Sequence, residues 1–358
     1  AKNTKHYITA LNGITDNEAR KKFMVVEHSY QNDFTNKFFT TRLKNATVPL
    51  RRKLFFPSFL KNKLNDVQLI HAHFAYIGFH CIPIKKKNGW PLVVSFYGYD
   101  YESIPFQFPK WNQRYKKMFA AADIVIAEGS AGAAKLKQMG CDEKKIKTLH
   151  LGVNTSAIPF HARNKNAAKL KLIQIAAWRE KKGQTFTVDA FIEASKTCDN
   201  LSLTFVGEGD DSVINNQKEK LSNVGLLDKV TFIPRMDFSK LYDFVKNYQV
   251  FIHPSCYAGN MDSEGGAPIV LLDVQATGMP VISTTHCDIP DEVIHNKTGL
   301  LTPEKNSVAL AQSIIRFYNM KQDEYNQFAV AAKQHVIAHY NLDDAGTNLE
   351  KMYSELLN

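Results

Sequence analysis

The sequence has few of the features that mark secreted or membrane-spanning proteins. Its five cysteines are odd in number, lie far apart and form no Cys-x-x-Cys pair, so neither a disulfide framework nor a zinc site is indicated. No apolar run approaches the roughly 18 residues needed to cross a bilayer. The first residues show neither the basic segment nor the apolar segment of a signal peptide. We therefore expect a cytosolic protein.

No internal repeat or low-complexity tract interrupts the chain of 358 residues. Short apolar runs instead alternate with amphipathic segments of helix length. Runs that are apolar on both faces are typical of parallel strands covered by helices. They fall at residues 67–74, 91–98, 122–130, 145–153, 170–177, 201–209, 229–235, 248–255 and 279–286. The pattern predicts an α/β fold with two Rossmann-like, doubly wound parallel sheets.

A polar segment without a clear period, residues 154–169, separates the two series of runs and is typical of a linker. We therefore predict a first domain over residues 1–160 and a second over residues 161–341. The amphipathic helix 342–358 is expected to pack back on the first domain. The first strand candidate, residues 6–11, follows no earlier strand and Gly-rich turn, which indicates that the first domain lacks its first strand.

The positive charge is concentrated in the first half of the chain. The formal net charge is +10, but residues 1–160 hold 25 Lys and Arg against 11 Asp and Glu, whereas residues 161–358 hold 20 against 24. In the segment 50–64, basic residues interleave with phenylalanines and leucines, the basic ones being Arg51, Arg52, Lys53, Lys61 and Lys63. This composition suits an anionic membrane surface. A solvated basic face is the alternative, and no nucleic-acid motif accompanies the charge.

Ligands of doubly wound sheets bind at the carboxyl ends of the strands, so the residues just after each strand are the candidates for a site. Arg179 and Lys182 follow the run 170–177 and supply the cations that a diphosphate needs. Gly207 and Gly209 form a tight turn after the next run, where backbone N–H groups can approach a phosphate. The turn alone does not indicate a dinucleotide oxidoreductase, because it lies in the second domain.

The most specific segment covers residues 263–284. Glu264 is followed by Gly265 and Gly266, whose N–H groups are unshielded, and Pro268 suits a first helical turn. A helix N-terminus of this kind is a seat for a diphosphate. Asp273, nine positions after Glu264, can accept hydrogen bonds from a ribose diol. Carboxylates that cap their own helix are the alternative for either residue alone.

These segments together resemble family 4 of the retaining glycosyltransferases, the GT-B family of bacterial polysaccharide and lipopolysaccharide assembly, and within it the colanic-acid type. The likeness covers roughly residues 65–358 and rests on HAHF (71–74), PLVVSFYGYD (91–100), LHLGVN (149–154), WREKKG (178–183), FVGEG (205–209), HPS (253–255) and the Glu264 segment. It implies two facing domains and transfer of a hexose from a nucleotide-diphosphate sugar, with a UDP-sugar favoured, to a lipid-linked or polysaccharide acceptor.

The resemblance also implies roles for individual residues. The donor would be bound by Arg179, Lys182, Gly207, Gly209, Arg235, Met236, Glu264, Gly265, Gly266, Ala267, Pro268 and Asp273. Of these, Arg179 and Lys182 would hold the diphosphate, Glu264 the transferred sugar and Asp273 the ribose. Tyr97 and His73 would orient acceptor and sugar, so that Glu264, Arg179, Lys182, Tyr97 and His73 are the expected catalytic set. His71 and His73 as satisfied core histidines are the alternative.

Three positions depart from the family pattern. The family's Glu-x7-Glu pair is here Glu264-x8-Asp273, Tyr97 stands where many relatives have a histidine, and Asn154 replaces a frequent aspartate. The departures leave open a catalytically inactive subunit that binds nucleotide-sugar or glycan for a partner enzyme. A nucleotide-sugar epimerase is a third interpretation.

The expected chemistry uses neither a cofactor nor a metal. The acidic triplets at 100–102 and 262–264 resemble a metal-binding Asp-x-Asp only superficially, and Arg179 and Lys182 already neutralise the phosphates. Catalysis would consist of positioning and of electrostatic stabilisation of the departing diphosphate. The sequence thus predicts a cytoplasmic enzyme held at the inner face of the membrane, with no nucleic-acid partner.

Overall fold

The computed structural model describes residues 7–10, 24–27, 67–165 and 169–357. The chain divides into two units, Ala1–Gln68 and Leu69–Asn358. In the first unit, strands β1 (Tyr7–Ala10) and β2 (Met24–Glu27) pair in parallel. The basic segment 50–64 lies outside the described residues.

The second unit begins with a parallel sheet of four strands in the order β3-β4-β5-β6. The strands are β3 (Ile70–His73), β4 (Leu92–Ser95), β5 (Ile124–Ala127) and β6 (Ile146–Thr148). The two central strands, β4 and β5, consist of buried residues throughout, as the apolar runs predict. Around them lie helices α3 (Ala75–Asn88), α4 (Ser103–Gln107), α5 (Lys110–Ala121) and α6 (Ser130–Gln138).

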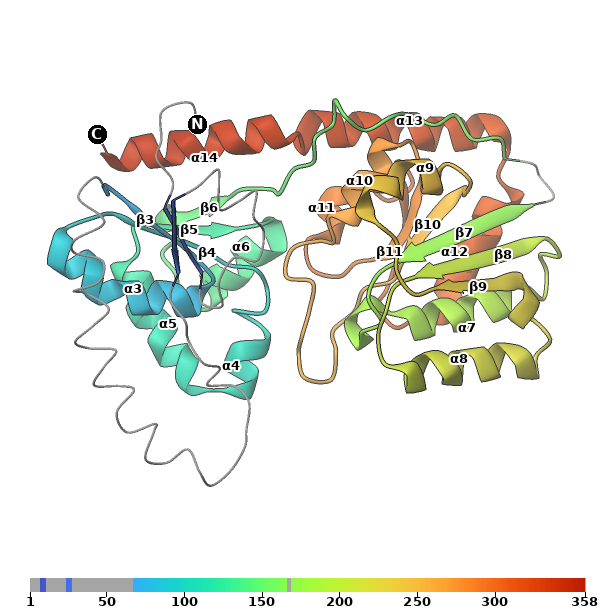
Figure 1. Ribbon diagram of the computed structural model, residues 1–358, viewed down its shortest axis with the longest axis horizontal. Helices are drawn as coiled ribbons and strands as arrows, with labels where there is room; N and C mark the ends of the chain where they lie inside the picture. Colours follow the sequence, from blue (N-terminus) through green and yellow to red (C-terminus); the bar gives the residue numbers. More distant parts are fainter. Residues whose placement is uncertain (1–6, 11–23, 28–66, 166–168, 358) are drawn as a thin grey trace, which may run out of the picture. The chain divides into compact units, whose positions relative to one another are not determined.

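The two faces of this sheet are covered by segments far apart in the sequence. Aromatic side chains of α5, among them Trp111 and Tyr115, pack in one cluster with the β4 and β5 residues Val94 and Val125. Neighbouring residues of the same strands, Val93, Ile124 and Ile126, instead contact the C-terminal helix α14 (Leu342–Leu357) through the side chains Leu349, Met352, Tyr353 and Leu356. Figure 1 shows this helix in red running past β5 and β6. The domain boundary at residue 160 stays a prediction.

A second parallel sheet has six strands in the order β12-β11-β10-β7-β8-β9. The strands are β7 (Leu170–Ile175), β8 (Leu201–Val206), β9 (Val230–Ile233), β10 (Val250–His253), β11 (Val281–Thr284) and β12 (Gly299–Thr302). The chain first adds strands on one side of β7 and then, from β10, on the other. The carboxyl ends of β7 and β10 therefore flank the topological switch point, where doubly wound folds bind ligands.

Helices cover both faces of the second sheet. They are α7 (Gln184–Ala194), α8 (Asp211–Asn223), α9 (Leu241–Val245), α10 (Val270–Ala276), α11 (Ile289–Glu292), α12 (Ser307–Asn319) and α13 (Gln322–His339). One core cluster joins α7 and α12 to the sheet, and another joins α9, α10 and α11. The predicted α/β class with two parallel-sheet domains is confirmed. None of the helices in the described ranges is long and apolar enough to span a membrane.

Candidate active site

The loop after β7 is held in place by polar contacts from the sheet itself. Gln174, on β7, donates from Nε2 to the main-chain carbonyl of Lys182 at 2.7 Å. The side-chain oxygen Oε1 of Gln174 accepts from Thr187 Oγ1 at 2.7 Å. The loop ends at Gly183, which has φ 68° and lies so close to Pro254 that an added Cβ would stand 2.0 Å from the Pro254 carbonyl oxygen. Only glycine fits this position. The loop thus presents Lys182 at the switch point.

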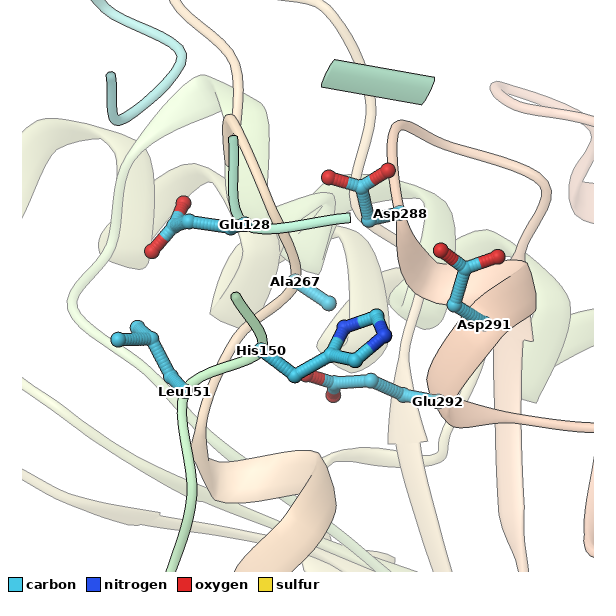
Figure 2. Close-up of a pocket in the computed structure, with 7 residues that line it drawn as sticks. All are labelled: Glu128, His150, Leu151, Ala267, Asp288, Asp291 and Glu292. Carbon is cyan, nitrogen blue, oxygen red and sulfur yellow. The ribbon is translucent and has the colours of Figure 1, made fainter. Parts of the chain in front are cut away.

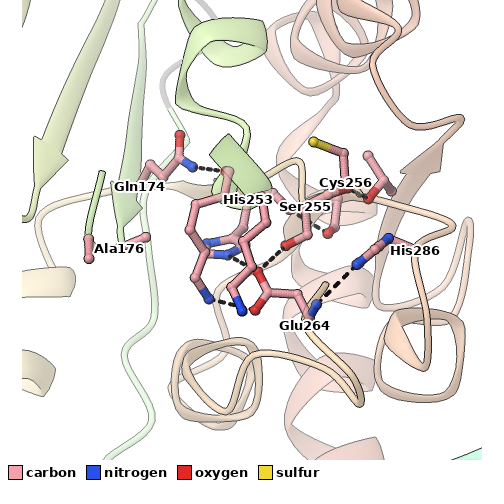
Figure 3. A network of polar contacts seen from close by, with 12 residues as sticks. Gln174, Ala176, His253, Ser255, Cys256, Glu264 and His286 are labelled. Atoms are coloured by element: carbon pink, nitrogen blue, oxygen red, sulfur yellow. Dashed lines mark hydrogen bonds and ion pairs between the residues drawn. The ribbon is translucent and has the colours of Figure 1, made fainter. Parts of the chain in front are cut away.

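Lys182 and Glu264 form the centre of the site. The ammonium nitrogen of Lys182 lies 2.6 Å from Oε2 of Glu264. The second carboxylate oxygen of Glu264 accepts from Ser255 Oγ at 2.9 Å (Figure 3). His253, at the end of β10, places Nε2 3.7 Å from the same oxygen. The Glu264 side chain is only 5% exposed. Two residues that were predicted separately, one for the diphosphate and one for the sugar, therefore lie in direct contact.

The Glu264 carboxylate is ionised. Burial by itself would raise its pKa, but the neighbouring His253 and the charge of Lys182 hold the pKa below its usual range. His253 stays neutral, because complete burial lowers its pKa. The lysine therefore supplies the charge that keeps this carboxylate buried and negative.

A second histidine fixes the backbone at Glu264. The N–H of Glu264 donates to Nε2 of His286 at 3.2 Å, and Nδ1 of His286 is 2.8 Å from a carboxylate oxygen of Glu304. His286 follows β11, so three successive strands of the sheet contribute to the position of one carboxylate. Figure 3 shows the imidazole aimed at Glu264. His286 is not among the site residues predicted from the sequence.

The remaining acidic residue of the triplet 262–264 is also paired. Lys181 donates to Asp262 Oδ1 at 3.1 Å and to the carbonyl of Ser263 at 2.7 Å. Glu180 accepts from the N–H of Gly259 at 3.1 Å. These bonds tie the turn after β7 to the loop after β10. Within the described part of the chain, no group of His, Cys, Asp or Glu side chains is arranged to hold a metal ion.

The glycine turn after β8 packs tightly against the end of β7. A Cβ at Gly207 would lie 1.9 Å from the carbonyl oxygen of Ala176, and one at Gly209 would lie 2.3 Å from Cβ of Trp178. Both glycines therefore allow neighbouring strand ends to approach. Arg235 and Met236 follow β9, the former exposed and the latter partly buried. The side chain of Arg179 is exposed in the loop after β7.

The predicted diphosphate seat lies just before a short helix. Helix α10 begins at Val270, so Gly265, Gly266, Ala267 and Pro268 all belong to the preceding loop. Asp273, on α10, is buried and accepts a hydrogen bond from the hydroxyl of Tyr242 at 2.8 Å. Burial raises the pKa of Asp273, and the Tyr242 bond opposes that effect. Asp273 therefore has a hydrogen-bond partner of its own, Tyr242.

In the first sheet, His73 and Tyr97 contact each other at the ends of β3 and β4. Nδ1 of His73 is 2.5 Å from the Tyr97 hydroxyl. Buried Asp100 accepts from the N–H groups of Ala75 and Tyr97 at 3.2 and 3.1 Å, which fixes the turns on both strands. Phe74, directly after His73, has φ 75°, a strained conformation for a residue with a side chain. The structure thus brings together the two residues predicted to orient acceptor and sugar.

Comparison with known proteins gives the family. Residues 159–335 match the model described as glycosyl transferases group 1, and residues 25–157 match that of glycosyltransferase family 4. The putative colanic acid biosynthesis glycosyltransferase WcaL of Escherichia coli K12 is 26% identical over 83% of this chain and 69% of its own length. The amylovoran biosynthesis glycosyltransferase AmsK of Erwinia amylovora is 26% identical over 68% of this chain and 58% of its own.

The chain is a glycosyltransferase of the GT-B type. Among solved structures, Anabaena HepE in complex with UDP and glucose superposes with a TM-score of 0.73 at 15% identity, covering 97% of this chain and 91% of that one. At this identity the likeness concerns the fold. The predicted resemblance to family 4 and to colanic-acid enzymes is confirmed.

The glycosyltransferase also has an acidic pocket that the sequence analysis did not find (Figure 2). Its lining includes the carboxyl groups of Glu128, Asp288, Asp291 and Glu292, together with His150, Leu151 and Ala267. Burial, and then the charge of Asp288, raises the pKa of Glu128 to about 8. One oxygen of Asp288 accepts from the N–H groups of Ala131 and Gly132 at the start of α6, at 2.6 and 3.2 Å. These carboxyl groups come after the ends of β5 and β11 in the sequence. Their position after strand ends is the signal by which they could have been predicted.

Proposed function

We propose that this glycosyltransferase moves a hexose from a UDP-sugar to a lipid-linked or polysaccharide acceptor, with retention of configuration and without a metal ion. The observation that carries the proposal is the contact of Lys182 with Glu264 at the switch point of the second sheet, 2.6 Å apart. At this place the cation can bind the diphosphate of a nucleotide-sugar, and the carboxylate can accept hydrogen bonds from its sugar. Support for UDP comes from HepE, which was solved with UDP and glucose.

In the proposed reaction, Lys182 and Arg179 stabilise the negative charge that develops on the diphosphate as its bond to the sugar breaks. Glu264 accepts hydrogen bonds from the sugar hydroxyls, and Ser255 and His286 keep its carboxylate and backbone in place. The acceptor oxygen forms the new bond on the face that the diphosphate leaves. A diphosphate oxygen takes the acceptor proton. The two cations supply the charge that a divalent metal provides elsewhere.

For the acceptor, the relatives named for colanic acid and amylovoran biosynthesis support a cell-surface polysaccharide. The basic excess of residues 1–160 supports docking on an anionic membrane through the segment 50–64. Removing Arg51, Arg52, Lys61 and Lys63 together should weaken vesicle binding by roughly 4 kcal/mol, at about 1 kcal/mol per charge. Sedimentation with anionic vesicles at low salt tests this. Binding by the quadruple variant as tight as that of the parent would leave only a solvated basic face.

The reaction is tested with a panel of nucleotide-sugars, following both binding and release of nucleotide diphosphate. We expect one UDP-sugar to bind and to turn over. NMR of the product should show the same anomeric configuration as in the donor. Donor binding without turnover under every acceptor condition would favour the inactive binding subunit. Inverted product would contradict the retaining mechanism.

A further inference from the structure

A thiol, an imidazole and a carboxylate contact one another in turn at the carboxyl ends of β11 and β12. Sγ of Cys287 lies 3.2 Å from Nε2 of His286, and Nδ1 of the same ring is 2.8 Å from Oε1 of Glu304. The second oxygen of Glu304 accepts from the N–H of Tyr257 at 3.0 Å. Both carboxylate oxygens are therefore held in place. A nucleophile, a base and a group that orients the base form the arrangement by which proteins activate a cysteine.

The carboxylate of Glu304 determines which nitrogen of His286 faces the thiol as an acceptor. Burial by itself would raise the pKa of Glu304, but the bonds from His286 and Tyr257 lower it. An ionised carboxylate only accepts hydrogen bonds, so Nδ1 of His286 donates and Nε2 is left as the acceptor. The N–H of Glu264, which points at Nε2, agrees with this assignment. Burial lowers the pKa of His286, but the contacts with Cys287 and Glu304 outweigh it and raise the pKa, which strengthens Nε2 as a base.

The backbone turns the thiol back against the ring of the preceding residue. Cys287 has φ 47°, in the left-handed region that residues with a side chain rarely adopt. The imidazole of His286 is buried, whereas Cys287 is partly exposed. The hydroxyl of Tyr257 lies 4.0 Å from the sulfur. A small reagent can therefore approach Cys287, while its base is shielded from water.

The other cysteines of the chain lie in different surroundings. Burial raises the thiol pKa of four of them, namely Cys81, Cys141, Cys198 and Cys256. In Cys256, where the pKa rises to about 11, the sulfur contacts the main-chain carbonyl of Glu180 at 3.6 Å. A carbonyl oxygen does not take up a proton at neutral pH. These four thiols are an internal reference for Cys287.

We propose that Cys287 is a modification site, a thiol that His286 and Glu304 activate for reaction with hydrogen peroxide. The sulfur attacks one peroxide oxygen, so that an S–O bond forms and the O–O bond breaks. The thiol proton passes to Nε2 of His286 and from there to the departing hydroxide, which leaves as water. The sulfur is oxidised by two electrons to a sulfenic acid, and the peroxide is reduced.

Oxidation of Cys287 should also loosen Glu264. Nε2 of His286 has one lone pair, and both the N–H of Glu264 and the sulfur of Cys287 lie 3.2 Å from that nitrogen. A thiol is a weak donor and leaves the lone pair to the N–H. The hydroxyl of a sulfenic acid is a stronger donor and competes for it, so Glu264 loses the bond that fixes its backbone. The consequence for the donor rests on the proposed function, in which Glu264 binds the sugar.

The direct test measures which cysteine reacts, without any turnover. The full-length protein is treated with hydrogen peroxide at neutral pH, sulfenic acids are trapped with dimedone, and peptide mass spectrometry gives the rate at each cysteine. We expect Cys287 to react first, and the other four cysteines roughly 10²-fold more slowly, the lower end of what a positioned base contributes. Equal rates at the five cysteines, or a faster reaction at any of the other four, would overturn the proposal.

Glu304→Gln removes the base without changing the thiol. The amide oxygen keeps the bond from the N–H of Tyr257, so the amide NH₂ faces Nδ1 of His286 and donates to it. The ring proton then moves to Nε2, which no longer accepts from Cys287. Trapping at Cys287 should slow by roughly 10²-fold.

The matched control is Glu180→Gln. Glu180 also accepts a backbone N–H, that of Gly259 at 3.1 Å, but its bond does not involve His286. The control should keep the parental rate at Cys287, and a thermal unfolding scan shows that both variants are folded. A parental rate in Glu304→Gln would overturn the role of His286 and Glu304. If Glu304→Gln does not fold, the order of reaction among the five cysteines of the parent decides the proposal.

Turnover supplies a second readout. Oxidation of the parent should lower kcat/KM for the donor by roughly two- to tenfold, the scale of one net hydrogen bond, and dithiothreitol should restore it. Cys287→Ala leaves Nε2 to the N–H of Glu264, so its turnover should equal that of the parent and should not respond to peroxide. An equal loss in Cys287→Ala would contradict the link to Glu264. If the parent turns over no nucleotide-sugar, the proposed function fails, whereas the trapping rates still decide the reactivity of Cys287.

Discussion

The carboxyl ends of the two parallel sheets carry different kinds of polar groups. At the ends of β7 and β10 the groups are charged, with Lys182 2.6 Å from an ionised, buried Glu264. At the ends of β3 and β4, a neutral ring and a hydroxyl face each other instead, with His73 2.5 Å from Tyr97. Charged groups suit a leaving diphosphate. Neutral groups can orient a hydroxyl but cannot balance the charge of a phosphate. On this comparison we propose that the donor binds at the second sheet and the acceptor at the first.

The largest effect should follow the removal of positive charge from the carboxyl end of the second sheet. Lys182→Met should lower turnover by about 10²- to 10³-fold, the scale of losing one group that stabilises the transition-state charge. Arg179→Ala should act similarly. Lys182→Met should also lower the free energy of unfolding, since it leaves Glu264 buried without its cation. The double variant Lys182→Met, Glu264→Gln should recover stability but not activity in steady-state and urea-unfolding measurements.

Parental turnover in either single variant would assign the diphosphate to other cations. Loss of turnover in Lys182→Met together with its full recovery in the double variant would show that the effect comes from misfolding around Glu264.

Acid should separate His71 from Glu264 by the pH at which each loses its contribution to stability. The pKa of His71 is about 3 in the folded protein against 6.5 ordinarily, so the unfolded chain binds the proton first. The contribution of neutral His71 to the free energy of unfolding is complete above pH 6.5. It is lost as the pH falls toward 3, at up to about 1.4 kcal/mol per pH unit. Glu264 has a lowered pKa, so its contribution is complete above its ordinary 4.5 and is lost only below that value.

Urea unfolding of the parent, His71→Gln and Glu264→Gln between pH 8 and pH 4 measures this order. His71→Gln should flatten the loss of stability between pH 6.5 and 4.5, whereas Glu264→Gln should keep the parental slope there. A parental slope in His71→Gln would mean that His71 is not held neutral in the folded chain.

Local pattern predicted most of the strands, because they fall within apolar runs, but β2 and β12 lie outside the predicted runs. The run 91–98 contains β4 and the run 248–255 contains β10. The site was predictable to the extent that residues follow strand ends, as Lys182 and Glu264 do. Their direct contact was not, since they are 82 positions apart and meet only through the strand order. Nor did any local signal connect Tyr353 with His71, 282 positions away.

A smaller effect is expected at Asp273. We expect Asp273→Asn to weaken the binding of free nucleotide diphosphate by about 1 to 2 kcal/mol, the cost of losing a charged hydrogen-bond partner of the ribose. Because Asp273 also accepts from Tyr242, the control is Tyr242→Phe, which removes that bond and keeps the carboxylate. Calorimetry with UDP compares the two. Equal affinity in the parent and Asp273→Asn would mean that Asp273 serves only to anchor Tyr242.

The smallest expected effect is that of chelation. Arg179 and Lys182 supply two positive charges next to the proposed diphosphate site, which is the charge that one divalent ion would bring. Turnover should therefore be the same with EDTA as without it, in the parent enzyme. The prediction is sharper in Lys182→Met, where one of the two charges is missing and added Mg²⁺ or Mn²⁺ can compensate by binding the diphosphate directly. If the added metal partly restores turnover in the variant and leaves that of the parent unchanged, Arg179 and Lys182 supply the charge that a metal would otherwise provide. Loss of parental activity in EDTA and its return with Mn²⁺ would instead assign part of that charge to a metal, with Asp262 as the carboxylate to test next.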